Sequence, residues 1–557
     1  MSEQSRKDYL SGAETHEVFN VSEPLENYNA YREDVFLQQL TQSMGANWAE
    51  SELTSWGKKT GSAQWIQWGF LANANPPRFH SHDAYGRRLD WVEYHPAYHS
   101  LMTKALGHGL HSIPWNQPGD GAHVYRAALT YLQTQVEQGH GCPVTMTFSC
   151  VPTLRLQPDL AEQWLPRILS THYDPTNCPV EEKRGATIGM AMTEKQGGSD
   201  LRANTTRARP LYAPGDGQPY QLVGHKFFMS APMSDAFLML AQAEAGLSCF
   251  LVPRWCPGGE KNGLIIQRLK DKMGNVSNAS SEVELRGALG WLIGDEGRGV
   301  ANILEMGALT RFDCMLASAA AMRQAVVQAV HHCSQRRAFG KTLVEQPLMQ
   351  NVLADLIVES DAALVLAMRM ARALDHSHNP DERALLRVGT AIGKYWNCKR
   401  APGYAYEAME CLGGSGVMND FMTARLYREA PINAIWEGSG NIQCLDVLRA
   451  LERKPECVQA LKSELARTQG LDQRLDRHIA KLFKLLEDQD GLVYGARTLV
   501  ESMALALQGS LLLRYGDARV ADAFLASRIA EPAGLYGNLP RGVPARALIE
   551  RTLPMYG

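Results

Sequence analysis

Four short stretches of the chain hold residue types that could move a proton or bind a ligand. Residues 434–442 read AIWEGSGNI and place Glu437 between an indole and a Gly-Ser-Gly turn. A carboxylate that an indole shields from water, beside such a turn, could be presented to a substrate as a general base. The alternative is that Glu437 only caps a helix next to a tight turn.

Two further stretches could approach a flat or phosphorylated ligand. Residues 190–200 combine two glycines with two hydroxyl side chains at the edge of a β-rich region, which allows close backbone approach. A plain Gly-rich turn would show the same pattern. Residues 224–230 end in an aromatic pair and a hydroxyl, which in isolation indicates core aromatics of a strand. Residues 335–341 carry two arginines and an aromatic near a helix end, which usually indicates a solvated terminus.

The spacing of apolar residues predicts the elements that position these stretches. Up to about residue 180 the spacing is helical, as in residues 124–136. Short apolar runs at 220–223, 237–241, 249–252, 264–269 and 283–285 alternate with Gly- and Pro-containing turns, which predicts antiparallel strands. Long helices are predicted at 303–336, 348–374 and 382–410, with more helix after 445.

The composition excludes several classes of protein. Of the 557 residues, 45% are hydrophobic and 21% charged, which excludes disorder as the main state. A formal net charge of −3 excludes a globally basic nucleic-acid coat. The 11 cysteines contain no C-x-x-C pair, and His331, His332, His376 and His378 have no matching ligand nearby, so neither disulfides nor a metal site is expected. The N-terminus MSEQSRKDYL has no apolar segment, so we expect a cytoplasmic protein without membrane spans.

Taken in order, these stretches resemble the acyl-CoA dehydrogenase flavoprotein superfamily over about residues 45–450, and most closely its AidB-like, adaptive-response branch. The resemblance is carried by ANANPP at 72–77, GRRLD at 86–90, TMTF at 145–148, TEKQGGSD at 193–200, RLKDKMGN at 268–275 and IWEGSGNI at 435–442. We therefore expect an α+β, mainly α chain: a helical domain (1–184), a middle antiparallel β domain (185–295), a helical domain with the catalytic Glu (296–450), and an extra C-terminal helical domain (451–557).

The resemblance implies that the cofactor is FAD and assigns residues to it. Thr193 would bond the pyrimidine side of the flavin, Ser199 would reach toward the phosphates, and Ser230 would place a hydroxyl near N5. Glu437 would be the general base that takes an α-proton from an acyl-CoA while a β-hydride passes to the flavin. Arg336 and Phe339 match a stretch that contacts the cofactor of a neighbouring subunit, which implies a homotetramer built as a dimer of dimers. The full set of implied cofactor contacts is Met190, Met192, Thr193, Gly198, Ser199, Phe228, Met229, Ser230, Arg336, Phe339, Ile435, Trp436, Ser439 and Asn441.

Three departures from the family pattern bear on activity. Trp436 stands where many relatives have Tyr, Ser439 where Thr is common, and Glu410 where Gln is frequent. The larger indole is expected to narrow the acyl pocket, and Glu410 would place a negative charge near the adenosine side of the cofactor. We therefore expect intact FAD binding and weak or residual dehydrogenase activity. Small acyl-CoA thioesters or alkylating agents are favoured as substrates over long acyl chains.

The last hundred or so residues extend beyond an ordinary member of this family and are basic. From residue 447 onward 16 Lys and Arg face 13 Asp and Glu, a net charge of +3, which leaves −6 for the rest of the chain. Leu471, Leu475, Ile479, Leu482 and Leu486 form an apolar stripe, whereas Arg474, Arg477, Lys481 and Lys484 recur at spacings of three and four on another face. This face could follow a phosphate backbone, or it could be a solvated face with Asp472 and Asp476 interleaved.

The AidB-like resemblance favours the first alternative, because that branch is associated with duplex DNA through its extra helical domain. Our sequence-based hypothesis is an FAD protein that binds double-stranded DNA through Arg474, Arg477, Lys481, Lys484 and Arg528 and takes part in the response to DNA alkylation damage. Contacts to the DNA backbone rather than to bases are expected. The alternatives are a metabolic short- or branched-chain acyl-CoA dehydrogenase whose last domain builds the oligomer, and a structural flavoprotein without turnover.

Overall fold

The computed structural model describes residue 13, residues 15–487 and residues 491–553. The first ten residues, on which the expectation of a missing signal segment depends, lie outside the described residues. Within the described part, no helix is long and apolar enough to cross a membrane. In the same part of the chain, no group of His, Cys, Asp and Glu side chains could hold a metal ion.

The first region is helical and carries one β-hairpin. The run at 124–136 that predicted a helix lies in α7, and almost all side chains of α7 are buried. The elements are α2 (Val35–Ser43), α3 (Glu50–Thr60), α4 (Ala63–Ala74), β1 (Arg78–His82), β2 (Arg88–Glu93), α5 (Pro96–Gly107), α6 (Ile113–Asn116), α7 (Ala122–Val136), α8 (Gly141–Leu154) and α9 (Pro158–Ile168).

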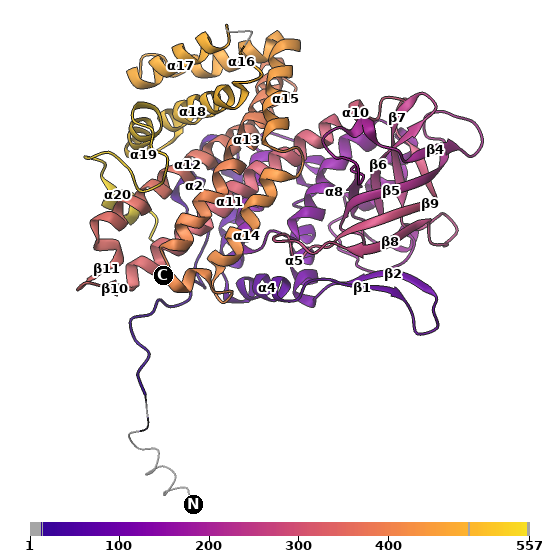
Figure 1. Ribbon diagram of the computed structural model, residues 1–557, viewed down its shortest axis with the longest axis horizontal. Helices are drawn as coiled ribbons and strands as arrows, with labels where there is room; N and C mark the ends of the chain where they lie inside the picture. The colour runs from indigo at the N-terminus through magenta and orange to yellow at the C-terminus, as the bar shows by residue number, and fades with distance from the viewer. Residues whose placement is uncertain (1–12, 14, 488–490, 554–557) are drawn as a thin grey trace, which may run out of the picture.

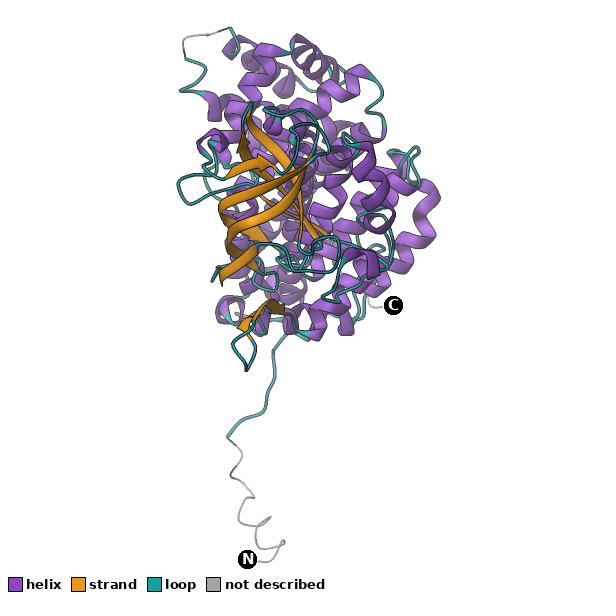
Figure 2. Cartoon of the chain, turned by 90° about the vertical axis from the view of Figure 1, so that its right-hand side faces the viewer, coloured by secondary structure: helices purple, strands orange, loops and turns teal. Residues whose placement is uncertain are grey.

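The middle region is a seven-stranded sheet that lies to one side of the helices (Figures 1 and 2). All five predicted apolar runs fall within its strands β5 to β9, but the pairing is not purely antiparallel, because β3 and β4 both pair with β6 in parallel. Since β6 also pairs with β7, the sheet closes on itself. The strands are β3 (Ile188–Ala191), β4 (Arg207–Pro210), β5 (Pro219–Ser230), β6 (Ala236–Ala243), β7 (Gly246–Pro253), β8 (Leu264–Leu269) and β9 (Ser280–Leu292).

Long helices form the centre of the molecule. The predicted segments at 303–336, 348–374 and 382–410 correspond to α11, α12 and α13, which pack against one another. α12 and α13 each begin at a proline, which lacks the N–H that a first helical turn leaves unpaired. The elements of this region are α10 (Gly299–Asn302), α11 (Leu304–Gln335), β10 (Arg337–Ala338), β11 (Lys341–Thr342), α12 (Pro347–Asp375), α13 (Pro380–Glu410), α14 (Met422–Ile435) and α15 (Gly440–Arg453).

The C-terminal helices cover the side of α12 and α13 that faces away from the sheet (Figure 1). They share one hydrophobic core with the long helices. Polar contacts cross the same boundary, for example from the indole N–H of Trp396 on α13 to Gln508 of α18 at 3.1 Å. The helices are α16 (Pro455–Ala466), α17 (Gln473–Leu485), α18 (Ala496–Tyr515), α19 (Ala518–Phe524), a π-helical turn (Leu525–Ala530) and α20 (Ala545–Glu550).

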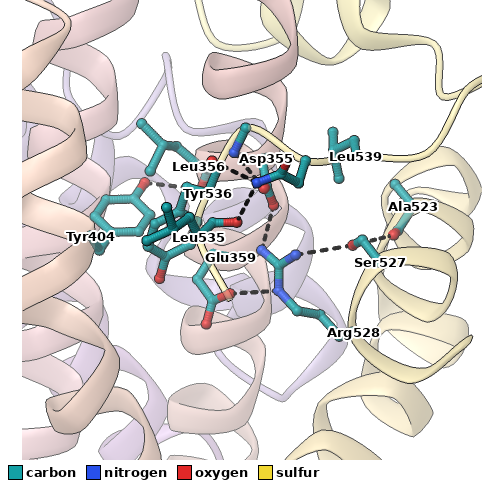
Figure 3. A network of polar contacts seen from close by, with 12 residues as sticks. Asp355, Leu356, Glu359, Tyr404, Ala523, Ser527, Arg528, Leu535, Tyr536 and Leu539 are labelled. Atoms are coloured by element: carbon teal, nitrogen blue, oxygen red, sulfur yellow. Dashed lines mark hydrogen bonds and ion pairs between the residues drawn. The ribbon is translucent and has the colours of Figure 1, made fainter. Parts of the chain in front are cut away.

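Arg528 belongs to this boundary and does not lie on a DNA-facing surface, which corrects the sequence-based assignment. Its side chain is only 11% exposed and forms ion pairs with Asp355 and Glu359 of α12 (Figure 3). Arg400 of α13 also pairs with Glu359. Although burial alone would raise the pKa of Glu359, the two guanidinium groups lower it to about 2. Arg528 therefore joins the C-terminal helices to the body of the protein.

We expect Arg528→Met to destabilise the protein by about 3–5 kcal/mol, because it leaves buried carboxylates without one of their cations. The matched control is Arg546→Met. Arg546 is exposed and, among the described residues, pairs only with Glu550, so its loss should change the free energy of unfolding by about 0.5 kcal/mol or less. Urea unfolding followed by circular dichroism measures the free energy of unfolding of both variants. Equal stabilities of the two variants would contradict the role of Arg528 as a buried connector.

Candidate functional site

A cavity of about 770 Å³ lies between the sheet, α8, α11 and the end of α14. It brings together most of the residues that the sequence assigned to a cofactor. Met229 does not reach the cavity, because alternate side chains of a strand point to opposite faces and its neighbours Phe228 and Ser230 face the cavity. The assigned residues that line it are Met190, Met192, Thr193, Gly198, Ser199, Phe228, Ser230, Ile435, Trp436, Glu437 and Ser439.

Three other assigned residues lie outside this cavity. Phe339, at the tip of the hairpin β10–β11, is 98% exposed and has a positive φ of 52°. The neighbouring Arg336 donates a hydrogen bond to the carbonyl of Asn20. A contact of both with the cofactor of a second subunit stays a prediction. Asn441 accepts a hydrogen bond from Nε of Arg497 on α18 at 2.9 Å, so its side chain connects α15 to the C-terminal helices.

A buried ion pair shapes the Gly-rich loop at the cavity edge. Nζ of Lys226 on β5 donates to Glu194 at 2.9 Å, and both side chains are fully buried. The same carboxylate accepts the backbone N–H groups of Thr205 and Thr206 at 2.7 and 3.1 Å. Although burial would raise the pKa of Glu194, these contacts hold it well below its usual range. This pair, for which the sequence gives no signal, fixes the loop that carries Gly198 and Ser199.

Several polar atoms at the cavity are buried and have no hydrogen-bond partner among the described residues. They include Oγ1 of Thr193, Oγ1 of Thr130, and the amide groups of Gln138 and Asn275, all on residues that line the cavity. A buried polar group without a partner costs free energy, so a ligand with polar edges would stabilise this wall. An isoalloxazine ring has such edges on its pyrimidine side. The residues present therefore fit FAD.

Glu437 lies in the cavity with an unusual backbone conformation. Its φ is +57°, a value that residues with a Cβ rarely adopt and that often occurs at functional sites. Its carboxylate accepts a hydrogen bond from the Thr310 hydroxyl of α11 at 2.7 Å. The carboxylate thus faces the cavity at the end of α14 instead of capping the next helix.

Donors from three helices hold the carbonyl groups around Glu437. Nζ of Lys394 on α13 donates to the carbonyls of Trp436 and Gly438 at 2.8 and 2.6 Å, and Lys394 is only 1% exposed. Nε of Arg311 on α11 donates to the carbonyl of Glu437 at 3.0 Å. Nε2 of Gln443 on α15 donates to the carbonyls of Glu437 and Gly438, both at 3.1 Å. None of these donors was predicted, since the sequence gives no signal that links them to residue 437.

A second acid lies at the cavity wall. Glu429 on α14 accepts the backbone N–H of Asn275 at 2.7 Å. Burial, together with the nearby charge of Glu137, raises the pKa of Glu429 to about 7. Lys272 lines the same wall, and burial lowers its pKa. The wall therefore combines two ionisable groups, whose pKa values burial shifts toward the neutral form, with apolar side chains.

The three departures from the family pattern occupy different positions. The indole of Trp436 lines the cavity and is fixed by a hydrogen bond from its N–H to Asn433 at 3.0 Å. Ser439 lines the cavity at the start of α15. Glu410 is exposed at the end of α13, outside the cavity lining. The fixed indole is the departure that bears directly on what the cavity accepts.

On α17 the structure separates the predicted DNA contacts into two kinds. Arg477, Lys481 and Lys484 are exposed. Arg474 is paired with Asp472 and Asp522, both at 2.7 Å. The apolar stripe packs inward as predicted at Leu475 and Leu482, whereas Leu471 precedes the helix and is exposed.

Comparison with known proteins identifies the family. The profile of the adaptive response protein AidB N-terminal domain matches residues 20–175, that of the acyl-CoA dehydrogenase middle domain residues 189–288, and that of the acyl-CoA dehydrogenase C-terminal domain residues 297–452. The chain is 44% identical to the AidB protein of Escherichia coli over 92% of its own length and 94% of that protein. This chain is an AidB-like member of the acyl-CoA dehydrogenase family. Accordingly, its cofactor is FAD, the coenzyme of that family.

Another relative and two solved structures are also similar to this chain. The chain is 30% identical to acyl-CoA dehydrogenase family member 11 of Caenorhabditis elegans over 84% of this chain and 79% of that protein. The solved structure of Caenorhabditis elegans ACDH-11 in complex with C11-CoA superimposes with a TM-score of 0.82 at 26% identity, covering 97% of this chain and 94% of that one. An acyl-CoA dehydrogenase from Bacillus anthracis complexed with FAD shares the fold with a TM-score of 0.62 at 19% identity, over 77% and 76% of the two chains.

We expect Thr193→Val to weaken FAD binding roughly three- to tenfold, because it keeps the shape of the side chain but removes a hydroxyl that has no hydrogen-bond partner in the described part of the chain. Titration of the apoprotein with FAD, followed by flavin fluorescence, measures the change. Thr171→Val, at an exposed position outside the cavity, is the control and should bind FAD like the wild type. The melting temperature of the Thr193→Val apoprotein should not fall, because the hydroxyl bonds to no group among the residues that the structure describes. A fall without weaker FAD binding would show that the hydroxyl serves only the fold.

Proposed function

We propose that this protein oxidises an acyl-CoA thioester, with Glu437 as the base that removes the α-proton. The observation that carries the proposal is the Glu437 carboxylate itself, which lies in the cavity and accepts the Thr310 hydroxyl at 2.7 Å. Bound FAD would supply the acceptor for the hydride that leaves the β-carbon. The walls formed by Met190, Met192, Thr193 and Ser199 would hold the flavin.

The residues around Glu437 prepare it for proton transfer. The three donors Lys394, Arg311 and Gln443 fix the backbone on both sides of the carboxylate, so its position does not depend on the substrate. A base that is already in place avoids an entropic cost in the transition state. Because Trp436 is fixed by Asn433, its indole limits the acyl space. A relative solved with C11-CoA supports an acyl-CoA as the substrate class. The weak turnover that we propose rests on the indole of Trp436 in the cavity wall.

The holoprotein should lose flavin absorbance when butyryl-CoA is added anaerobically, and Glu437→Gln should slow this bleaching by about 10²–10⁴-fold while FAD stays bound. The control is Glu305→Gln, which changes an exposed acid of α11. Stopped-flow absorbance measures the rate of flavin bleaching in the wild type, Glu437→Gln and Glu305→Gln. Bleaching of Glu437→Gln at the wild-type rate would exclude Glu437 as the base. A wild type that does not bleach with acyl-CoA of any chain length would favour a flavoprotein without turnover.

A second function is favoured by the surface of α17. We propose that Arg477, Lys481 and Lys484 bind the backbone of duplex DNA and that the protein takes part in the response to DNA alkylation. The interleaved acids are already engaged: Asp472 pairs with Arg474, and Asp476 accepts the backbone N–H of Gly470 at 3.2 Å. The three cations are thus left facing solvent. The match to an adaptive response protein over residues 20–175, and the likeness to the AidB protein, support the biological context.

Replacing Arg477, Lys481 and Lys484 together with Gln should weaken duplex binding and lower the slope of log affinity against log salt by about 0.9 for each phosphate that these cations neutralise. Fluorescence anisotropy with a labelled duplex at several salt concentrations measures this slope. The control replaces three exposed cations elsewhere, Lys104, Arg207 and Arg209, with Gln. If both triple variants bind alike, the α17 surface is not the DNA site. If the wild type binds no duplex at low salt, the alternative of a metabolic dehydrogenase with a C-terminal oligomerisation domain gains support.

A further inference from the structure

A second cavity, of about 230 Å³, lies where the end of α12 and the start of α13 meet α16 and α18. It shares no lining residue with the flavin cavity. Four arginines line it, namely Arg369, Arg372, Arg467 and Arg514. Arg369 and Arg372 lie on α12, whereas Arg467 follows α16 and Arg514 lies on α18, so the fold gathers arginines from three segments at one place.

Two of these arginines, Arg369 and Arg514, form ion pairs with carboxylates. Arg369 is buried and makes hydrogen bonds of 2.7 and 2.9 Å to Glu382 and of 2.8 and 3.0 Å to Glu464. Arg514 donates to Glu464 at 2.7 Å and to the hydroxyl of Tyr515 at 2.8 Å. Although burial would raise the pKa of Glu464, these cations lower it to about 2. Arg369 and Arg514 thus connect α12 and α18 to α16.

The other two arginines have few partners. Arg372 is half-buried, and its hydrogen bond to the Tyr515 hydroxyl is long, at 3.4 Å. Among the described residues, no carboxylate lies within ion-pair distance of Arg372. Arg467 reaches Glu464 only at 3.4 Å, and that carboxylate already accepts from Arg369 and Arg514. Four guanidinium groups therefore face the carboxylates of Glu382 and Glu464, and the carboxylate of Asp120 lies 3.3 Å from Nε2 of His376, another lining residue. Among the described residues, the arginines of the recess outnumber these acids by one.

We propose that this cavity binds a small phosphorylated anion, of the size of phosphate or pyrophosphate, through Arg372 and Arg467. The half-buried Arg372 is stabilised when an anion replaces the water that it has lost, whereas Arg467 is 54% exposed and lies at the mouth of the recess. The planar guanidinium of each matches two phosphate oxygens at once. Asn379 and His376 add polar groups at the same wall. The site is a recess between helices, unlike the exposed row of cations on α17, so a small anion fits it better than a duplex.

Isothermal titration of the full-length, FAD-loaded protein with sodium pyrophosphate at constant ionic strength tests this site. The protein is loaded with FAD so that the pyrophosphate group of the cofactor fills its own binding surface. Added pyrophosphate then cannot bind there. The wild type should bind pyrophosphate, and the double variant Arg372→Gln/Arg467→Gln should bind at least about tenfold more weakly. The matched control is Arg383→Gln, which removes an exposed arginine of α13 outside the cavity and should bind like the wild type.

Arg372→Lys keeps the charge but loses the planar guanidinium that matches two phosphate oxygens. It should bind pyrophosphate with an affinity between those of the wild type and the double variant. Thermal melting in the absence of anion separates a folding defect from a binding defect, because Arg372 holds no carboxylate and its replacement should leave the melting temperature unchanged. Absence of pyrophosphate binding to the wild type would overturn the proposal. Equal affinity of the double variant and the Arg383→Gln control would do the same. Duplex binding that requires Arg372 and Arg467 without any pyrophosphate binding would assign the recess to DNA instead.

Discussion

The positive φ of Glu437 is the constraint on which the rest of the site depends. A residue with a side chain held at positive φ costs about 1–3 kcal/mol, so the surrounding structure must stabilise it. Lys394, Arg311 and Gln443 do so with hydrogen bonds to three successive carbonyls. Because these donors belong to α13, α11 and α15, the position of one carboxylate depends on how the whole central bundle packs.

The opposite wall of the cavity has its own support. The Glu194–Lys226 pair fixes the Gly-rich loop to the sheet, and the loop leaves the Thr193 hydroxyl without a partner among the described residues. One wall therefore places the Glu437 carboxylate through helix packing, and the other leaves polar groups without partners among the described residues through strand packing. The two meet because α8 and α11 pack together and α8 lies against β3. The chemistry depends on this junction between a sheet and a bundle.

Much of this arrangement could be predicted from the sequence, for identifiable reasons. Apolar spacing located the long helices, and residues 190–200 and 434–442 did line one cavity. Lys394 and Arg311 could not be found, because their partners are backbone carbonyls 42 and 126 residues away. Arg528 was placed on the wrong surface, since charge alone does not reveal burial against Asp355 and Glu359. The Met229 side chain lies outside the cavity lining, because a strand that directs Phe228 and Ser230 to one face directs Met229 to the other.

The contact between Trp396 and Gln508 has a consequence for how the parts of this protein communicate. Trp396 and Lys394 are two residues apart on α13, so the helix that holds the backbone around Glu437 also contacts α18. The cavity around Glu437 and the C-terminal helices therefore contact the same helix. If a ligand in the cavity or a ligand on the C-terminal helices shifts α13, thermodynamic linkage requires that each ligand change the affinity of the protein for the other by the same factor. Substrate and C-terminal ligand would then act as mutual effectors, with α13 as the element that couples them.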